Sequence, residues 1–140
     1  MDRQQLIHEL EAIINKGFED YPFPYVKGNS IRIGKIVIRS SRHGYLVYDT
    51  ECNKQVVQTF SEASAIAIAK NLAQNKNITD RVMDIDKTLE KNYNDALYYQ
   101  NSYNKTKDEL KKDVLETRLD IATTEIYNAK SQLMSMLFLD

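Results

Sequence analysis

The 140-residue sequence has no tryptophan, one cysteine, two prolines and four glycines. The single thiol, Cys52, excludes an intramolecular disulfide and any zinc site built from several thiolates. No stretch approaches the roughly 18–20 consecutive apolar residues of a membrane helix, and the opening MDRQQLIHELEAI is polar rather than signal-like. We therefore expect no membrane association and a reducing compartment.

An excess of either charge is also missing. The chain has 19 Lys and Arg residues against 20 Asp and Glu, a formal net charge of −1, so no global field draws it to nucleic acid or to an anionic membrane. Hydrophobic residues make up 42% and charged residues 28%, which is typical of ordinary folded domains. The length allows one domain with a core, or a small domain with a helical extension.

The N-terminal segment, from Asp2 to about Lys16, is predicted to form a short amphipathic helix, with Gly17 placed as a C-terminal cap. Its apolar stripe consists of Leu6, Ile7, Leu10, Ile13 and Ile14. Pro22 and Pro24 in FEDYPFPYVKGN then break the helix, so this stretch is interpreted as an extended connector.

From Ser30 to Phe60 the apolar period changes to two, which indicates strands. A two-residue turn at Gly34-Lys35 would pair Ile33 with Ile36, although a bulge within one long strand gives the same faces. SSRHG and ECNK supply further turns, so we expect an antiparallel meander of three or four strands. Ser61 is an N-cap candidate for the helix SEASAIAIAKNLA, whose small residues suit close packing on a sheet.

The last Gly is Gly44, and residues 78–140 contain neither Gly nor Pro. Two coiled-coil-like seams run through this half: Ile78, Val82, Ile85 and Leu89, then Leu115, Leu119, Ala122, Ile126, Ala129, Leu133 and Met136. Between them YYQNSYNKTKDEL holds poor helix formers and a capping-box pattern at Thr106 and Glu109. Either the chain turns near residues 101–106 into a helical hairpin, which we favour, or one helix of about 60 residues continues.

The expected fold class is therefore α+β: an N-terminal helix, an antiparallel meander with a packed helix, then long C-terminal helices. We expect a small α+β domain over residues 1–77. Residues 78–140 would form a helical hairpin or coiled-coil extension. Tyrosines and seam residues of this extension are the candidate partner interface, with packing against the N-terminal domain as the alternative: Tyr93, Tyr98, Tyr99, Tyr103, Leu115, Leu119, Ile126 and Leu133.

Residues suited to catalysis or metal binding are few. His8 and His43 are the only histidines, and Cys52 lies in a turn with acidic neighbours, which does not activate a thiol. Asp80, Asp84 and Asp86 lack the glycine and closing Glu of a calcium loop, and no Gly-rich phosphate loop is present. We expect no catalytic site, no metal and no cofactor.

One stretch concentrates positive charge. Between Tyr21 and Tyr48 there are basic residues and no acidic one: Lys27, Arg32, Lys35, Arg39 and Arg42. Arg32 and Arg39 should project from the face opposite the isoleucines, so these strands are a candidate nucleic-acid contact. Five charges give only a modest phosphate contribution, and no aromatic stacking motif is evident on that face. A solvated face of charges that protects the sheet edge is the simpler interpretation.

The stretches IRIGKIVIRSSRHGYLVYDTECNKQVVQTFSEASAIAIAKNL and KNYNDALYYQNSY…TRLDIA resemble short, uncharacterised proteins of large tailed marine phages related to the T4 type. The resemblance covers the chain from about Ile31 onward and carries over no catalytic residues. It implies a viral protein in the virion or in the cytoplasm of a bacterial host. Taken together, we expect a non-catalytic structural or assembly protein that forms homo-oligomers or binds another protein. The alternative is a small nucleic-acid-binding or host-regulatory protein.

Overall fold

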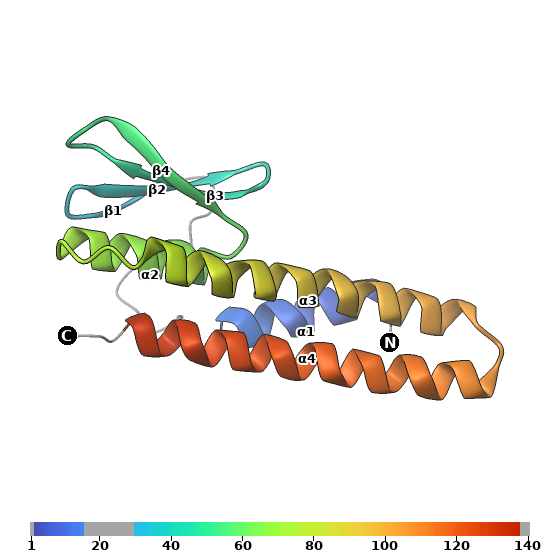
Figure 1. The fold of residues 1–140 in the computed structure, drawn as a ribbon. Helices are drawn as coiled ribbons and strands as arrows, with labels where there is room; N and C mark the ends of the chain where they lie inside the picture. Colours follow the sequence, from blue (N-terminus) through green and yellow to red (C-terminus); the bar gives the residue numbers. More distant parts are fainter. Residues whose placement is uncertain (1, 16–29, 138–140) are drawn as a thin grey trace.

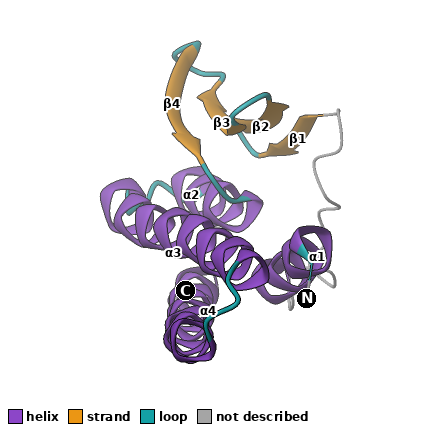
Figure 2. Cartoon of the chain, turned by 90° about the vertical axis from the view of Figure 1, so that its right-hand side faces the viewer, coloured by secondary structure: helices purple, strands orange, loops and turns teal. Residues whose placement is uncertain are grey.

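The computed structural model describes residues 2–15 and 30–137. The described chain has helices and strands in the order α1 (Arg3–Asn15), β1 (Ser30–Ile33), β2 (Ile36–Ser41), β3 (Gly44–Asp49), β4 (Lys54–Thr59), α2 (Glu62–Ala73), α3 (Thr79–Lys105) and α4 (Glu109–Leu137). One face of the sheet lies on α2, and the long pair α3 and α4 runs beneath, with α1 alongside (Figures 1 and 2). The predicted α+β fold is confirmed. The proposed connector, its two prolines and the Gly17 cap lie outside the described residues.

The strands form a four-stranded antiparallel sheet in the order β1-β2-β3-β4. Ile33 pairs with Ile36 across the Gly34-Lys35 turn, which confirms the predicted hairpin. Gly34 takes a φ of +59°, a conformation that glycine adopts without strain. The inward face buries five aliphatic side chains: Ile31, Ile33, Ile36, Ile38 and Val47. Val47 pairs with Val57 but Tyr48 pairs with Gln55, so Val56 is the extra residue of a bulge in β4.

Helix α2 is the layer between the sheet and the long helices (Figure 2). The predicted N-cap is confirmed, because the Ser61 side chain accepts a hydrogen bond from the Ser64 backbone N–H at 3.0 Å. Every residue from 61 to 69 is buried. Alanines at alternate positions keep the helix thin, so apolar layers can approach it from both sides.

Helices α3 and α4 form the favoured hairpin and bury the predicted seams against each other and their neighbours. The turn lies at residues 106–108 rather than 101–106. Helix α3 continues through the weak helix formers, where Gln100 Nε2 donates to Asn104 Oδ1 at 3.1 Å. The cap also differs from the Thr106–Glu109 pattern, since Asp108 Oδ1 accepts from the backbone N–H groups of Leu110 and Lys111. Tertiary packing extends the helix beyond its intrinsic propensity.

Helix α1 packs on α3 and α4 more than on α2. The buried Lys130 Nζ donates to the backbone oxygen of Ile13 at 2.7 Å, so α4 stabilises the C-terminal turn of α1. One cluster of buried residues runs from α1 through the sheet and α2 to the hairpin. The boundary at residue 77 stays a prediction, and this shared core crosses it.

Candidate functional site

The residues that sequence analysis considered for catalysis lie apart. His8 is exposed on α1, His43 is exposed in the β2–β3 turn, and Cys52 is exposed in the β3–β4 turn. The two turns are at opposite ends of β3. Within the residues that the structure describes, no three His, Cys, Asp or Glu side chains gather as a metal site would need.

The three aspartates of early α3 do not act together. Asp80 and Asp84 are exposed, whereas Asp86 is buried and accepts four hydrogen bonds from the β4–α2 junction. Its Oδ2 accepts from the Phe60 N–H at 2.7 Å. Its Oδ1 accepts from the Ser61 N–H at 3.1 Å, the Ser61 hydroxyl at 3.1 Å and the Ser64 hydroxyl at 2.6 Å.

This carboxylate is therefore the anion at the N-terminus of α2, supplied by a different helix. Its four hydrogen bonds join α3 to the start of α2. The sequence contains a pattern that predicts the burial of Asp86, because this residue falls on the same helical face as the seam residues Val82 and Leu89. A carboxylate on a buried face needs hydrogen-bond partners, but the pattern does not say which.

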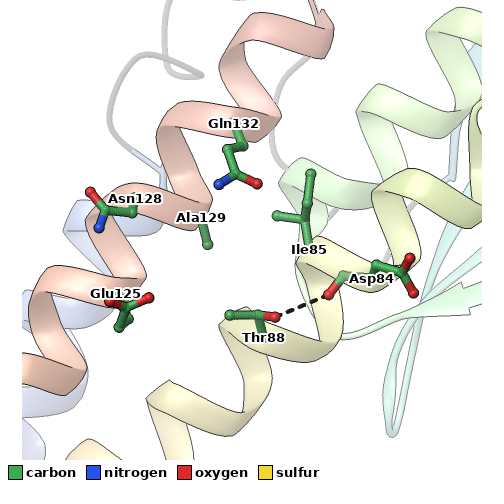
Figure 3. A pocket seen from close by; sticks show the side chains of 7 residues that line it. All are labelled: Asp84, Ile85, Thr88, Glu125, Asn128, Ala129 and Gln132. Atoms are coloured by element: carbon green, nitrogen blue, oxygen red, sulfur yellow. Dashed lines mark hydrogen bonds between the residues drawn. The ribbon is translucent and has the colours of Figure 1, made fainter.

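A depression of about 210 Å³ lies between α3 and α4 (Figure 3). The side chains that line it are Asp84, Ile85, Thr88, Glu125, Asn128, Ala129 and Gln132. The Thr88 hydroxyl donates to the backbone oxygen of Asp84 at 3.2 Å. The carboxylate of Asp84 points away from α4 in Figure 3, so it does not pair with Glu125 across the gap.

The predicted interface tyrosines take different roles. Tyr93 is half-buried with its ring 5.2 Å from that of Phe60, and burial, helped by the charge of Glu11, raises the pKa of its phenol. Tyr103 lies under the ammonium of Lys112, 5.6 Å from the ring centre. Tyr98 is 67% exposed.

The predicted aliphatic interface residues also divide. Ile126 and Leu133 are fully buried within the chain, so in this fold they are core rather than partner contacts. The reason is that α1, α2 and α3 together cover this part of α4. Leu115 and Leu119 are half-buried and remain at the margin of the seam.

Sequence analysis missed a second apolar stripe on α4. Leu110 is 77% exposed, Val114 51% and Ile121 58%. Their spacing of four and seven residues places them on one helical face, away from the buried seam. We call these three residues the α4 stripe. Leu110, Val114 and the half-buried Leu115 also line a shallow groove with Lys111 and Arg118.

Of the predicted nucleic-acid contact residues that the structure describes, one forms an ion pair and three are exposed without one. Lys27 lies outside the described residues. Lys35 forms an ion pair with Glu51 at 3.2 Å, and this hydrogen bond, with the charge of Glu51, raises the pKa of the ammonium. Arg32, Arg39 and Arg42 are exposed.

Sequence analysis does not identify Tyr48 as a candidate contact residue. Its ring lies near the guanidinium of Arg39, whose Cζ is 5.6 Å from the ring centre. The strand register puts Arg32 and Tyr48 in one row, both directly opposite Val37. The sequence does contain a pattern that predicts the side of the sheet on which Tyr48 lies. In YLVYDT it follows Leu46 by two residues, so both side chains fall on the same face of the strand.

Among the described helices, none combines the length and apolarity that spanning a membrane requires. No protein-family model, curated protein or solved structure matches the chain.

Proposed function

We propose that this chain is a non-catalytic structural or assembly protein that associates with a second copy of itself through the α4 stripe. The observation that carries the proposal is the exposure of Leu110, Val114 and Ile121 on one helical face. The resemblance to phage proteins suggests the virion, or the cytoplasm of an infected bacterium, as the place where it acts. That part of the proposal rests on the resemblance alone.

The position of the stripe favours association between helices. The end of the hairpin that joins α3 to α4 extends beyond the sheet and α2 (Figure 1), so a second hairpin can approach it without meeting the sheet. Apolar residues with this spacing are typical of one helix packing along another. The stripe is short, and burying three side chains per copy supports only weak association, in the micromolar range or weaker.

Charge on either side of the stripe supports a parallel arrangement. Lys111 and Arg118 lie on one flank, while Asp113 and Asp120 lie on the other, and all four are exposed. In a parallel pair of helices, the acidic flank of one copy faces the basic flank of the other, and a spacing of five residues brings Asp113 to Arg118 of the partner subunit. An antiparallel pair would bring the two acidic flanks together.

Light scattering after size-exclusion chromatography tests association, with full-length protein loaded from about 10 µM to about 1 mM. We expect a concentration-dependent dimer in the wild type. Ile121→Glu should weaken it at least tenfold, because a charge would be buried in the contact. Tyr127→Glu is the matched control, since Tyr127 is also exposed but lies on another face of α4. Wild-type protein that stays monomeric throughout would contradict the proposal.

A charge swap tests the parallel arrangement separately. Asp113→Arg and Arg118→Asp should each weaken the dimer by about fivefold, because each places like charges across the contact. The double variant restores opposite charges and should recover most of the loss. A double variant that is weaker than both single variants would rule out this pairing.

A further inference from the structure

One face of the sheet is turned away from α2 (Figure 2), and we call it the outer face. By the strand register, Arg32, Tyr48 and Gln55 come from one cross-strand row, and Arg39, Leu46 and Gln58 come from the next. We call these six residues the outer sheet face. Tyr48 and Leu46 are half-buried and the other four are exposed. The strands contact α2 through the opposite face, where the isoleucines are buried.

Positive charge is concentrated on this sheet although the whole chain has a net charge of −1. Residues 30–60 carry five basic and two acidic side chains. Asp49 is the last residue of β3, and Glu51 lies in the turn that follows. Glu51 pairs with Lys35, and Asp49 Oδ1 accepts from the Glu51 backbone N–H at 2.9 Å. The outer sheet face itself contains no carboxylate. Within the described part of the chain, Arg32 and Arg39 form no ion pair.

An aromatic ring stands beside these charges. The Arg39 guanidinium lies 5.6 Å from the centre of the Tyr48 ring, and Arg32 lies in the same cross-strand row as Tyr48. Arg32 and Arg39 are diagonal neighbours, which places them roughly 7–8 Å apart on a sheet. Two cations at such a spacing can each meet a phosphate of one extended strand, while the ring offers a surface for a base.

We propose that the outer sheet face binds single-stranded nucleic acid, with a base stacked on Tyr48 and phosphates held by Arg32, Arg39 and Arg42. Arg42 extends the basic path at the β2–β3 turn. The exposed amides of Gln55 and Gln58 can donate to or accept from base edges. This site is separate from the α4 stripe and does not depend on self-association.

A single strand fits this face better than a duplex does. Three arginines give few phosphate contacts, so duplex binding by charge alone would be weak. Stacking adds a contribution that only unpaired bases can supply, because their faces are accessible. The net negative charge of the chain also limits long-range attraction, so binding must come from contacts on the face itself.

Fluorescence anisotropy of labelled 20-nucleotide dT and rU strands, with the full chain at about 50 mM salt, tests the site. We expect saturable binding, with log Kd rising with log salt at a slope of about 2 for three phosphates. Tyr48→Leu should weaken binding about tenfold, whereas Tyr48→Phe should keep it. Arg39→Gln should lower the slope by about 0.7. A dU strand, which differs from rU only in lacking the 2′-hydroxyl, shows whether that group contributes.

Matched controls separate the site from general charge and from folding. Arg3→Gln removes an exposed arginine on α1, and Tyr127→Leu removes an exposed tyrosine on α4, and neither should change the affinity. Circular dichroism checks that each variant is folded. The double variant Arg32→Gln/Arg39→Gln tests the outer sheet face without altering half-buried Tyr48. Absence of binding up to about 100 µM, or equal loss in the controls, would overturn the proposal. So would a duplex that binds as tightly as the single strands.

Discussion

The two halves of α4 carry apolar stripes of similar spacing but different surroundings. In the half nearer the C-terminus, Ile126, Ala129 and Leu133 are buried by α1, α2 and α3. In the half next to the turn, Leu110, Val114 and Ile121 point away from the chain and are more than half exposed. The first stripe is part of the core, and the second is the surface through which we propose that two copies associate. Spacing alone therefore does not tell core from interface, since the neighbours of each stripe decide its role.

The largest expected difference between the two stripes is in the free energy of unfolding lost when one residue of each is truncated. Leu133→Ala should cost about 3 kcal/mol of unfolding free energy, because it leaves a cavity in a closed core. Ile121→Ala should change it by no more than about 0.5 kcal/mol at monomer concentrations, because that side chain is exposed. Urea denaturation followed by circular dichroism measures both. Equal losses of unfolding free energy would contradict the assignment of one stripe to the core and the other to the surface.

A smaller effect is expected at the polar contact that joins the hairpin to α2. Asp86→Asn should cost about 2 kcal/mol, because the amide leaves a buried N–H of the β4–α2 junction without an acceptor. Asp84→Asn makes the same chemical change at an exposed position of α3 and should be nearly neutral. The same denaturation experiment compares them. A neutral Asp86→Asn would show that the junction forms without the carboxylate.

The smallest effect concerns alkaline pH. Burial raises the pKa of the Tyr45 and Tyr93 phenols above the ordinary value near 10, so the folded state keeps protons that the unfolded state loses. This contribution is present below about pH 10 and is lost as pH rises through the folded pKa values. Tyr45→Phe and Tyr93→Phe should therefore flatten the fall in stability between about pH 8 and pH 11. The measurement is the urea midpoint of each variant and of the wild type at the two pH values. If stability falls with pH as steeply in the variants as in the wild type, the prediction is wrong.

Local chemistry made most of the fold predictable. Gly34 and Lys35 specify a two-residue turn, Ser61 specifies a helix start, and a change of apolar period separates strands from helices. These signals operate over a few residues, so they survive without knowledge of the tertiary structure. The sequence predicts the hairpin turn too early, because intrinsic helix propensity is weaker than the packing that extends α3 to Lys105.

The sites were less predictable because they depend on neighbours distant in sequence. The acceptor role of Asp86 depends on Ser61 and Ser64, more than twenty residues earlier. The burial of Ile126 depends on which helices cover α4. Tyr48 could be assigned to the outer sheet face from alternation, but its proximity to Arg39 required the register of β2 against β3.

The hydrogen bond from Lys130 to Ile13 joins residues 117 positions apart. During synthesis the ribosome releases α1 long before α4 exists, and Leu6 and Leu10 have no hairpin to cover them in that interval. Folding must therefore wait until most of the chain has emerged, since contacts between distant segments carry the cost of closing a long loop. A nascent chain stalled after α3 would expose the apolar side of its first helix to chaperones and proteases.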